Sequence, residues 1–185
     1  MYGMINTALA DLVKNQFGED QWKKILEKTG LADALFDHLT PYPDHLTYQL
    51  VGAACEELQV PAEAMLNLFG KHWVRYAESN GYKEILSLFG NNLRNSLENL
   101  NHLHARMSLL MPKLSPPRFE VPNSEFNQDP RQMELWYFSN RAGLLPMLQG
   151  IIEGLAEKFG EKITIKIEPK AGPQDPDIIK IFFQD

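Results

Sequence analysis

Apolar residues return every three or four positions through most of the first 111 residues, which is the spacing of amphipathic helices. The first stripe begins at Ile5, and Gly18 follows it as a residue expected to end a helix. Asp44 stands where an N-cap is expected, ahead of a stripe that runs to Leu58. The expected helices cover residues 5–17, 21–28, 44–58, 61–79, 82–89 and 91–111.

The periodicity changes after residue 111, because five prolines between positions 112 and 130 leave no room for a long helix. Alternating apolar positions then predict strands at 118–121, 133–139, 163–167 and 178–183, and helical spacing returns at 144–159. The last two strands are expected to form an antiparallel hairpin. We therefore expect a single α+β domain over 1–185, with a mainly helical part, 1–111, and a part, 112–185, that holds a small antiparallel sheet of about four strands and helices.

The composition is that of an ordinary globular protein, with 44% apolar residues in a chain of 185. The net charge of −6 disfavours a general nucleic-acid binder, and no apolar run is long enough for membrane insertion. Cys55 is the single cysteine, so one chain forms neither an internal disulfide nor a cysteine-based zinc site. The start of the chain does not read as a signal peptide, and the expected location is cytoplasmic.

His104 occupies an apolar position of the expected helix 91–111, among leucines and methionines. His102 is rotated from it by about 200° and shares a face with Glu98 and Arg106. The two imidazoles therefore diverge and cannot chelate one metal. His104 is either a core residue or an axial ligand to the iron of a flat, apolar macrocycle. The remaining histidines, His38, His45 and His72, are expected at the surface.

Tyr137, Ser139 and Arg141 form a second candidate group. If the strand stays extended to Arg141, its period of two puts the three side chains on one face. A phenol, a hydroxyl and a guanidinium in a row can hold a ligand with more than one carboxylate. The alternative is that Tyr137 packs in the core and Arg141 is the exposed end of a strand.

Four segments together resemble the heme-nitric oxide/oxygen-binding (H-NOX) family along nearly the whole chain. They are 1–6 (MYGMIN), 99–106 (NLNHLHAR), 112–119 (PKLSPPRF) and 137–141 (YFSNR). The resemblance implies a b-type heme between the helical and the sheet-containing parts, with His104 as the iron ligand. It also implies that Tyr137, Ser139 and Arg141 bind the heme propionates.

The same resemblance implies that Pro117 presses on one heme face and Ile5 on the other, which would distort the porphyrin. Members that hold oxygen carry a tyrosine where this chain has Pro146. Without a hydrogen-bond donor there, we expect NO and CO to bind and no stable oxygen complex to form, unless the indole N–H of Trp73 donates instead of filling space. The other residues implied to line the heme site are Met4, Leu144, Met147 and Leu148.

The implied function is gas sensing without catalysis. NO bound opposite His104 weakens the iron–histidine bond, and release of His104 frees its helix. The sequence carries no kinase or cyclase domain, so the expected output is a separate signalling protein, a histidine kinase or a cyclic-di-GMP enzyme. Two alternatives are a heme-free interaction module with His104 in the core, and a heme peroxidase-type enzyme, which would need a distal acid–base pair that the apolar stretch does not provide.

Overall fold

The computed structural model describes residues 1–32, 34–82, 84 and 90–184. The chain forms two compact units. One, here the helical unit, combines Met1–Tyr76 with Leu145–Ile151, and the other, here the sheet unit, combines Ala77–Leu144 with Ile152–Asp185. Helices and a four-stranded antiparallel sheet within the described residues confirm the expected α+β class, whereas the single-domain expectation stays a prediction. Within those residues we find no helix long and apolar enough to cross a membrane.

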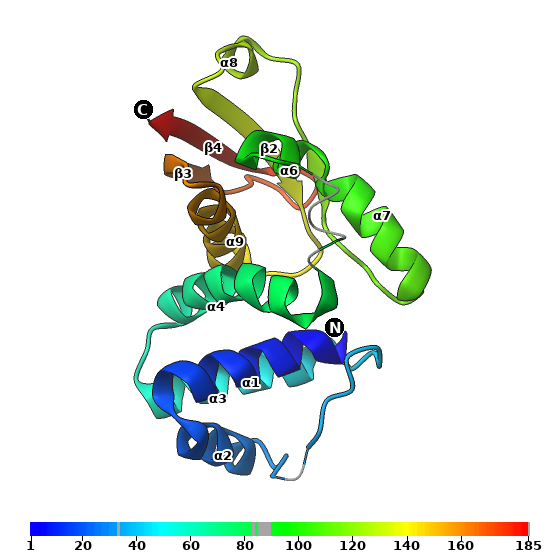
Figure 1. Ribbon diagram of the computed structural model, residues 1–185, viewed down its shortest axis with the longest axis vertical. Helices are drawn as coiled ribbons and strands as arrows, with labels where there is room; N and C mark the ends of the chain where they lie inside the picture. Colours follow the sequence, from blue (N-terminus) through cyan, green and yellow to red (C-terminus); the bar gives the residue numbers. More distant parts are fainter. Residues whose placement is uncertain (33, 83, 85–89, 185) are drawn as a thin grey trace. The chain divides into compact units, whose positions relative to one another are not determined.

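The helical unit is built from the stripes seen in the sequence (Figure 1). Its helices are α1 (Gly3–Phe17), α2 (Glu19–Lys28), α3 (Asp44–Leu58) and α4 (Ala62–Ala77). Gly18 ends α1 with φ 99°, a conformation that glycine adopts readily. The expected N-cap role of Asp44 is wrong, because Pro43 holds that position. Asp44 lies in the first turn, where its negative carboxylate interacts favourably with the positive end of the helix dipole.

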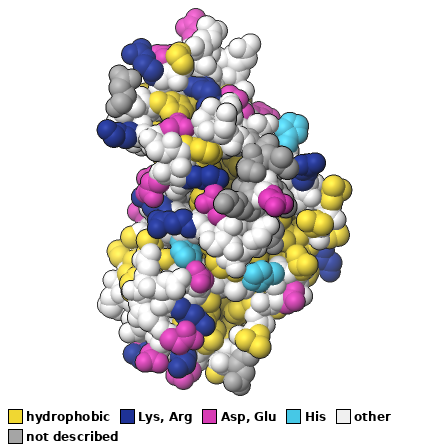
Figure 2. All heavy atoms as spheres, in the orientation of Figure 1, with side chains coloured by type: hydrophobic (Ala, Val, Ile, Leu, Met, Phe, Trp, Pro, Cys, Tyr) yellow, Lys and Arg dark blue, Asp and Glu magenta, His cyan; other side chains and the backbone are white. Residues whose placement is uncertain are grey.

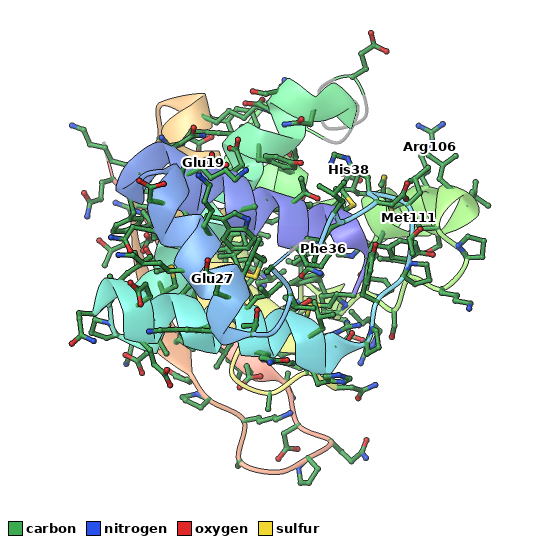
Figure 3. The ribbon with its side chains drawn as sticks, turned by 90° about the horizontal axis from the view of Figure 1, so that it is seen from below. Glu19, Glu27, Phe36, His38, Arg106 and Met111 are labelled. Carbon is green, nitrogen blue, oxygen red and sulfur yellow. The ribbon has the colours of Figure 1, made fainter. Side chains whose placement is uncertain are left out.

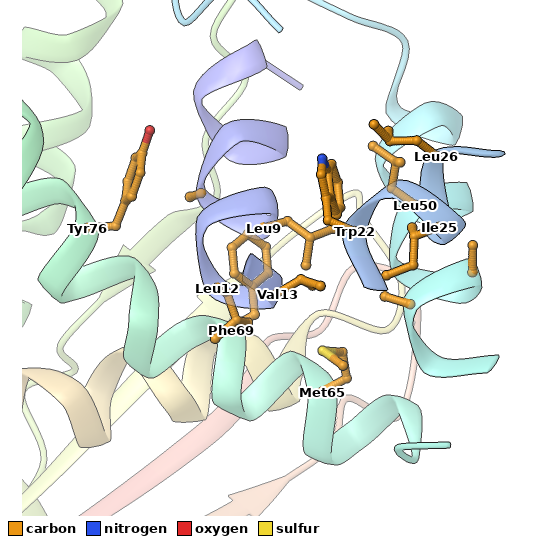
Figure 4. Packing of buried hydrophobic residues seen from close by; sticks show 13 residues of the cluster. Leu9, Leu12, Val13, Trp22, Ile25, Leu26, Leu50, Met65, Phe69 and Tyr76 are labelled. Atoms are coloured by element: carbon orange, nitrogen blue, oxygen red, sulfur yellow. The ribbon is translucent and has the colours of Figure 1, made fainter. Parts of the chain in front are cut away.

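Interlocking apolar side chains from these helices form the core of the helical unit (Figure 4). Burial of such side chains removes apolar surface from water, which is the main favourable term in folding. The largest completely buried members from α1, α2, α3 and α4 are Leu9, Leu12, Ile25, Leu50, Met65 and Phe69.

Two glycines let α4 and the beginning of α9 (Leu145–Phe159) approach each other closely within the helical unit. A Cβ atom on Gly70 would meet the backbone oxygen of Met147, and one on Gly150 would meet the backbone oxygen of Asn67. Neither position therefore has room for a side chain.

The sheet unit is organised around four strands in the order β1-β2-β4-β3, each antiparallel to its neighbours. Their bounds are β1 (Arg118–Glu120), β2 (Gln132–Phe138), β3 (Lys162–Glu168) and β4 (Asp177–Gln184). The expected hairpin is confirmed by the pairing of β3 with β4. Along β2, Met133, Leu135 and Tyr137 are buried and their neighbours are half-buried, as the period of two predicts.

The continuous helix expected over 91–111 is wrong, because it divides into α6 (Leu93–Glu98) and α7 (Leu100–Leu110). Asn99 separates them with φ −94° and ψ 3°, and its side-chain Nδ2 donates to the carbonyl of Asn95 at 2.9 Å. This local hydrogen bond favours a turn over helix propagation. The described residues of this unit also include a π-type turn η1 (Glu78–Tyr82) and the short helix α8 (Glu125–Gln128). The helix expected over 82–89 falls mostly outside the described residues.

Candidate functional site

The candidate site in the sheet unit begins with His104 on α7. Its ring is half-buried and lies 6.0 Å, centroid to centroid, from the ring of Phe119 on β1. In the part of the chain that the structure describes, the buried Nδ1 of His104 has no hydrogen-bond partner. A buried polar atom without a partner costs free energy, and a bound group is one explanation for it.

The electrostatic setting favours the neutral form of His104. Burial lowers the pKa of His104 and outweighs the effect of the nearby Pro117 backbone, which acts in the opposite direction. A neutral imidazole offers a lone pair, which is the form that ligates metal. His102 and Arg106 on the other face of α7 are exposed, as the helical rotation predicts, and Figure 3 shows Arg106 extending outward from α7.

An aromatic contact continues from His104 into the sheet. The Phe119 ring lies 5.4 Å from the ring of Tyr137, its register partner on β2. Phe119 and Tyr137 are both 5% exposed. The structure therefore brings His104, Pro117 and Tyr137 into one neighbourhood of the sheet unit, with Phe119 between them. Phe119 was not singled out from the sequence, although its place in the 112–119 segment and its apolar character could have indicated it.

Ser139 and Arg141 do not share the strand face of Tyr137 in the way expected, because β2 ends at Phe138. Ser139 Oγ instead accepts a hydrogen bond from the backbone N–H of Arg141 at 3.1 Å, which stabilises a turn. The Arg141 guanidinium donates through Nη1 to the carbonyl of Ser115 at 2.5 Å. This contact ties the turn after β2 to the segment that precedes β1.

The residues expected on the opposite side of a heme mostly lie in the helical unit. Met4 and Leu148 are buried there, and Ile5, Trp73 and Met147 pack at the margin of its core. Trp73 stacks on Tyr76 of the same helix, with centroids 6.1 Å apart and planes at 24°. Leu144 belongs to the sheet unit and is half-buried at the N-cap of α9.

A polar network in the helical unit was missed from the sequence. His72 Nε2 lies 2.8 Å from Asp11 Oδ2 on α1, and the Tyr76 hydroxyl lies 3.1 Å from Nε2 of His38. The expected surface position of His72 is wrong, since its side chain is 13% exposed, whereas His45 is exposed as expected. His72 and Tyr76 are four residues apart and share one face of α4. This spacing is the sequence signal that could have indicated two polar side chains on the same side of the helix.

Charge and metal-ligand groups give no competing site. Lys and Arg side chains are interspersed with Asp and Glu over the face seen in Figure 2. No group of three or more His, Cys, Asp or Glu residues suited to a metal ion occurs within the described residues.

Comparison with known proteins gives one family and a consistent fold. A family model described as Haem-NO-binding matches residues 2–167. An H-NOX protein from S. oneidensis in the Fe(II)NO ligation state is similar in structure with a TM-score of 0.86, and the match covers 100% of both chains. Its sequence is 22% identical, so this likeness shows the fold.

Curated relatives include two soluble guanylate cyclases of Caenorhabditis elegans. The protein gcy-34 is 30% identical over 174 residues, which are 91% of this chain and 24% of that protein. The protein gcy-32 is 28% identical over 177 residues, which are 91% of this chain and 25% of that protein. The chain therefore spans about a quarter of the length of these relatives.

Proposed function

Since this chain belongs to the haem-NO-binding (H-NOX) family, as its motifs indicated, we propose that it is a heme-based sensor of NO and CO that forms no stable oxygen complex. The observation that carries the proposal is the half-buried His104, whose Nδ1 lacks a partner among the described residues and whose pKa is lowered by burial. A bound heme would supply an iron atom that His104 ligates and that can take a gas molecule as a further ligand.

The residues of the sheet unit fit a heme. His104 would ligate the iron, and Phe119 provides an aromatic surface beside its ring. Tyr137, Ser139 and Arg141 would bind the propionates, with the Arg141 guanidinium as the charged donor. A non-covalent heme b is the proposed form, because covalent attachment of the c type uses a pair of cysteines and Cys55 is the only cysteine. Pro117 and Ile5 are further residues proposed to contact the heme.

The proposed ligand selectivity rests on the side chains offered to a bound gas. Met4, Met147 and Leu148 have no hydrogen-bond donor, and Pro146, the second residue of α9, cannot donate through its backbone either. Leu144 adds a further apolar side chain. Stacking of Trp73 on Tyr76 supports a space-filling role for Trp73. Bound oxygen gains more from a donor than NO or CO does, so the apolar lining favours the latter two.

Signal output is proposed to begin with His104. Release of His104 from a bound heme would remove one of the contacts that fix α7, and a partner protein would read this two-state change. The proposed partner is a separate cytoplasmic signalling protein, a histidine kinase or a cyclic-di-GMP enzyme. The chain itself is proposed to sense without catalysing a reaction.

An anaerobic absorption spectrum of the ferrous protein tests the proposal. We expect a Soret band that shifts when NO or CO is added and no stable oxygenated spectrum in air. Absence of the band after heme reconstitution would contradict heme binding and favour the heme-free interaction module. A stable oxygenated spectrum would contradict the proposed ligand selectivity but not heme binding. Turnover of hydrogen peroxide with a reducing substrate would favour the peroxidase alternative.

A further inference from the structure

Asn101, on the first turn of α7, holds β1 through two hydrogen bonds. Its side-chain Oδ1 accepts from the backbone N–H of Phe119 at 3.0 Å, and its Nδ2 donates to the carbonyl of Phe119 at 2.6 Å. One carboxamide therefore satisfies both backbone groups of one residue, as the N–H and C=O of one residue on a neighbouring antiparallel strand would. We call this arrangement the Asn101–Phe119 pair.

The pair explains how a strand of three residues is kept in register. The N–H and C=O of one strand residue point to the same side, so both groups of Phe119 point away from β2. Phe119 and Tyr137 are consequently a non-hydrogen-bonded antiparallel pair, the kind in which opposite side chains approach most closely. The 5.4 Å separation of their ring centroids agrees with this geometry.

The same helix face that carries Asn101 carries His104, since residues three apart lie side by side on a helix. Asn101 binds the backbone of Phe119, while the His104 ring lies 6.0 Å from its side chain. The distance from His104 to the Tyr137 strand is therefore set through one residue, Phe119, that Asn101 fixes.

The preceding helix is anchored separately. Arg94 on α6 donates to the carbonyls of Asp129 and Pro130, at 3.4 and 3.3 Å, and to that of Gln132. The backbone N–H of Leu93 donates to the carboxylate of Glu161 at 2.8 Å. Because Asn99 separates α6 from α7, these contacts fix the position of α6 but do not fix that of α7.

We propose that Asn101 is a positioning residue for His104, which through the Asn101–Phe119 pair holds α7 against β1 and so fixes the imidazole relative to Tyr137. The inference rests on the proposed role of His104 as iron ligand. It implies that the pair opposes movement of α7 when His104 leaves the iron.

The test uses Asn101→Ala in the heme-loaded and heme-free protein, with Asn95→Ala as the matched control. Asn95 is a half-buried asparagine of the same region, and its side-chain amide donates to Asn91 Oδ1 at 3.2 Å in a solvent-exposed hydrogen bond. In Asn101→Ala we expect amide hydrogen exchange to accelerate about tenfold at Phe119 and across 103–107, the effect of one net hydrogen bond. In the ferrous protein we expect the iron–histidine stretching band in the resonance Raman spectrum to broaden and move to lower frequency. Asn95→Ala is expected to change neither readout.

Faster exchange confined to Phe119, with 103–107 and the iron–histidine band unchanged, would overturn the proposal, because Asn101 would then only cover the edge of a strand. Unchanged exchange at Phe119 would overturn it as well. If Asn101→Ala does not fold, Asn101→Asp serves instead, since it keeps the acceptor for the Phe119 N–H and loses the donor. Should the wild-type protein bind no heme, the proposed function fails, while exchange in the heme-free protein still decides whether Asn101 fixes α7.

Discussion

His72 Nε2 and Asp11 Oδ2 lie 2.8 Å apart and join α4 to α1. The carboxylate raises the pKa of His72, but burial has the larger effect and lowers it overall. The unfolded chain, with a histidine pKa of about 6.5, then binds more protons than the folded chain just below that pH. The contribution of His72 to stability is therefore complete above pH 6.5 and is lost as the pH falls toward the lowered folded-state pKa.

We expect the free energy of unfolding of the heme-free protein to fall between pH 7.5 and 5.5, and to fall less in His72→Gln. Urea denaturation at the two pH values measures this. His45→Gln, at an exposed position, is the control and should follow the wild type. Identical pH dependence in wild type and His72→Gln would mean that Asp11 fully compensates for burial.

The close approach of α4 and α9 predicts a large effect for one added methyl group. Gly70→Ala and Gly150→Ala each place a Cβ against backbone atoms of the facing helix, so each is expected to destabilise the protein by about 2–3 kcal/mol. Gly52→Ala on α3 is the matched control, because nothing lies within 4 Å of its Cβ position. That substitution should stabilise by up to about 1 kcal/mol. Thermal unfolding separates the two cases, and a stable Gly70→Ala would refute the close approach.

Removal of the proposed iron ligand tests the switch. His104→Gly is expected to lose most of its heme during purification and to regain a Soret band with added imidazole, which then occupies the ligand position without being tied to α7. Exchange at 103–107 should be faster in this rescued protein than in the wild type. His102→Gly is the control, as it introduces glycine on the exposed face of the same helix at a similar cost in helix propensity. Equal exchange in rescued His104→Gly and wild type would contradict release of α7 as the signal.

The propionate role of Arg141 predicts faster heme loss. Arg141→Ala removes a charge-assisted donor and is expected to raise the rate of heme transfer to an acceptor protein about tenfold, whereas Arg141→Lys keeps the charge and should lie between. Arg131→Ala removes an exposed arginine that pairs with Asp129, and it should leave the rate unchanged. Equal rates in all three variants would remove Arg141 from the proposed site.

Hydrophobic periodicity predicted α1 to α4, the four strands and the hairpin because these elements bury one regular face. It missed the break at Asn99 because the apolar spacing continues across it, from Leu97 to Leu100, while the turn depends on a side-chain hydrogen bond to Asn95. The early end of β2 has a similar cause, since Ser139 Oγ binds the backbone two residues ahead.

The candidate site was only partly accessible to sequence reasoning. His104 and Tyr137 were singled out as candidates because their motifs are local, whereas the contact of His72 with Asp11 joins residues 61 positions apart. The Asn101–Phe119 pair likewise joins two segments through a backbone that carries no residue-specific signal. Interactions of this kind become visible only when the fold brings the segments together.

In the order β1-β2-β4-β3 the outer strands are β1 and β3, and pairing with another chain is hindered in a different way at each. On β1 the carboxamide of Asn101 occupies the backbone groups that another strand would use. On β3 the exposed positions include Lys162 and Lys166, and a second chain pairing there would bring like charges together. Sheet extension by a neighbouring molecule is thereby disfavoured at both outer strands, which protects the protein from edge-to-edge aggregation as long as α7 holds β1.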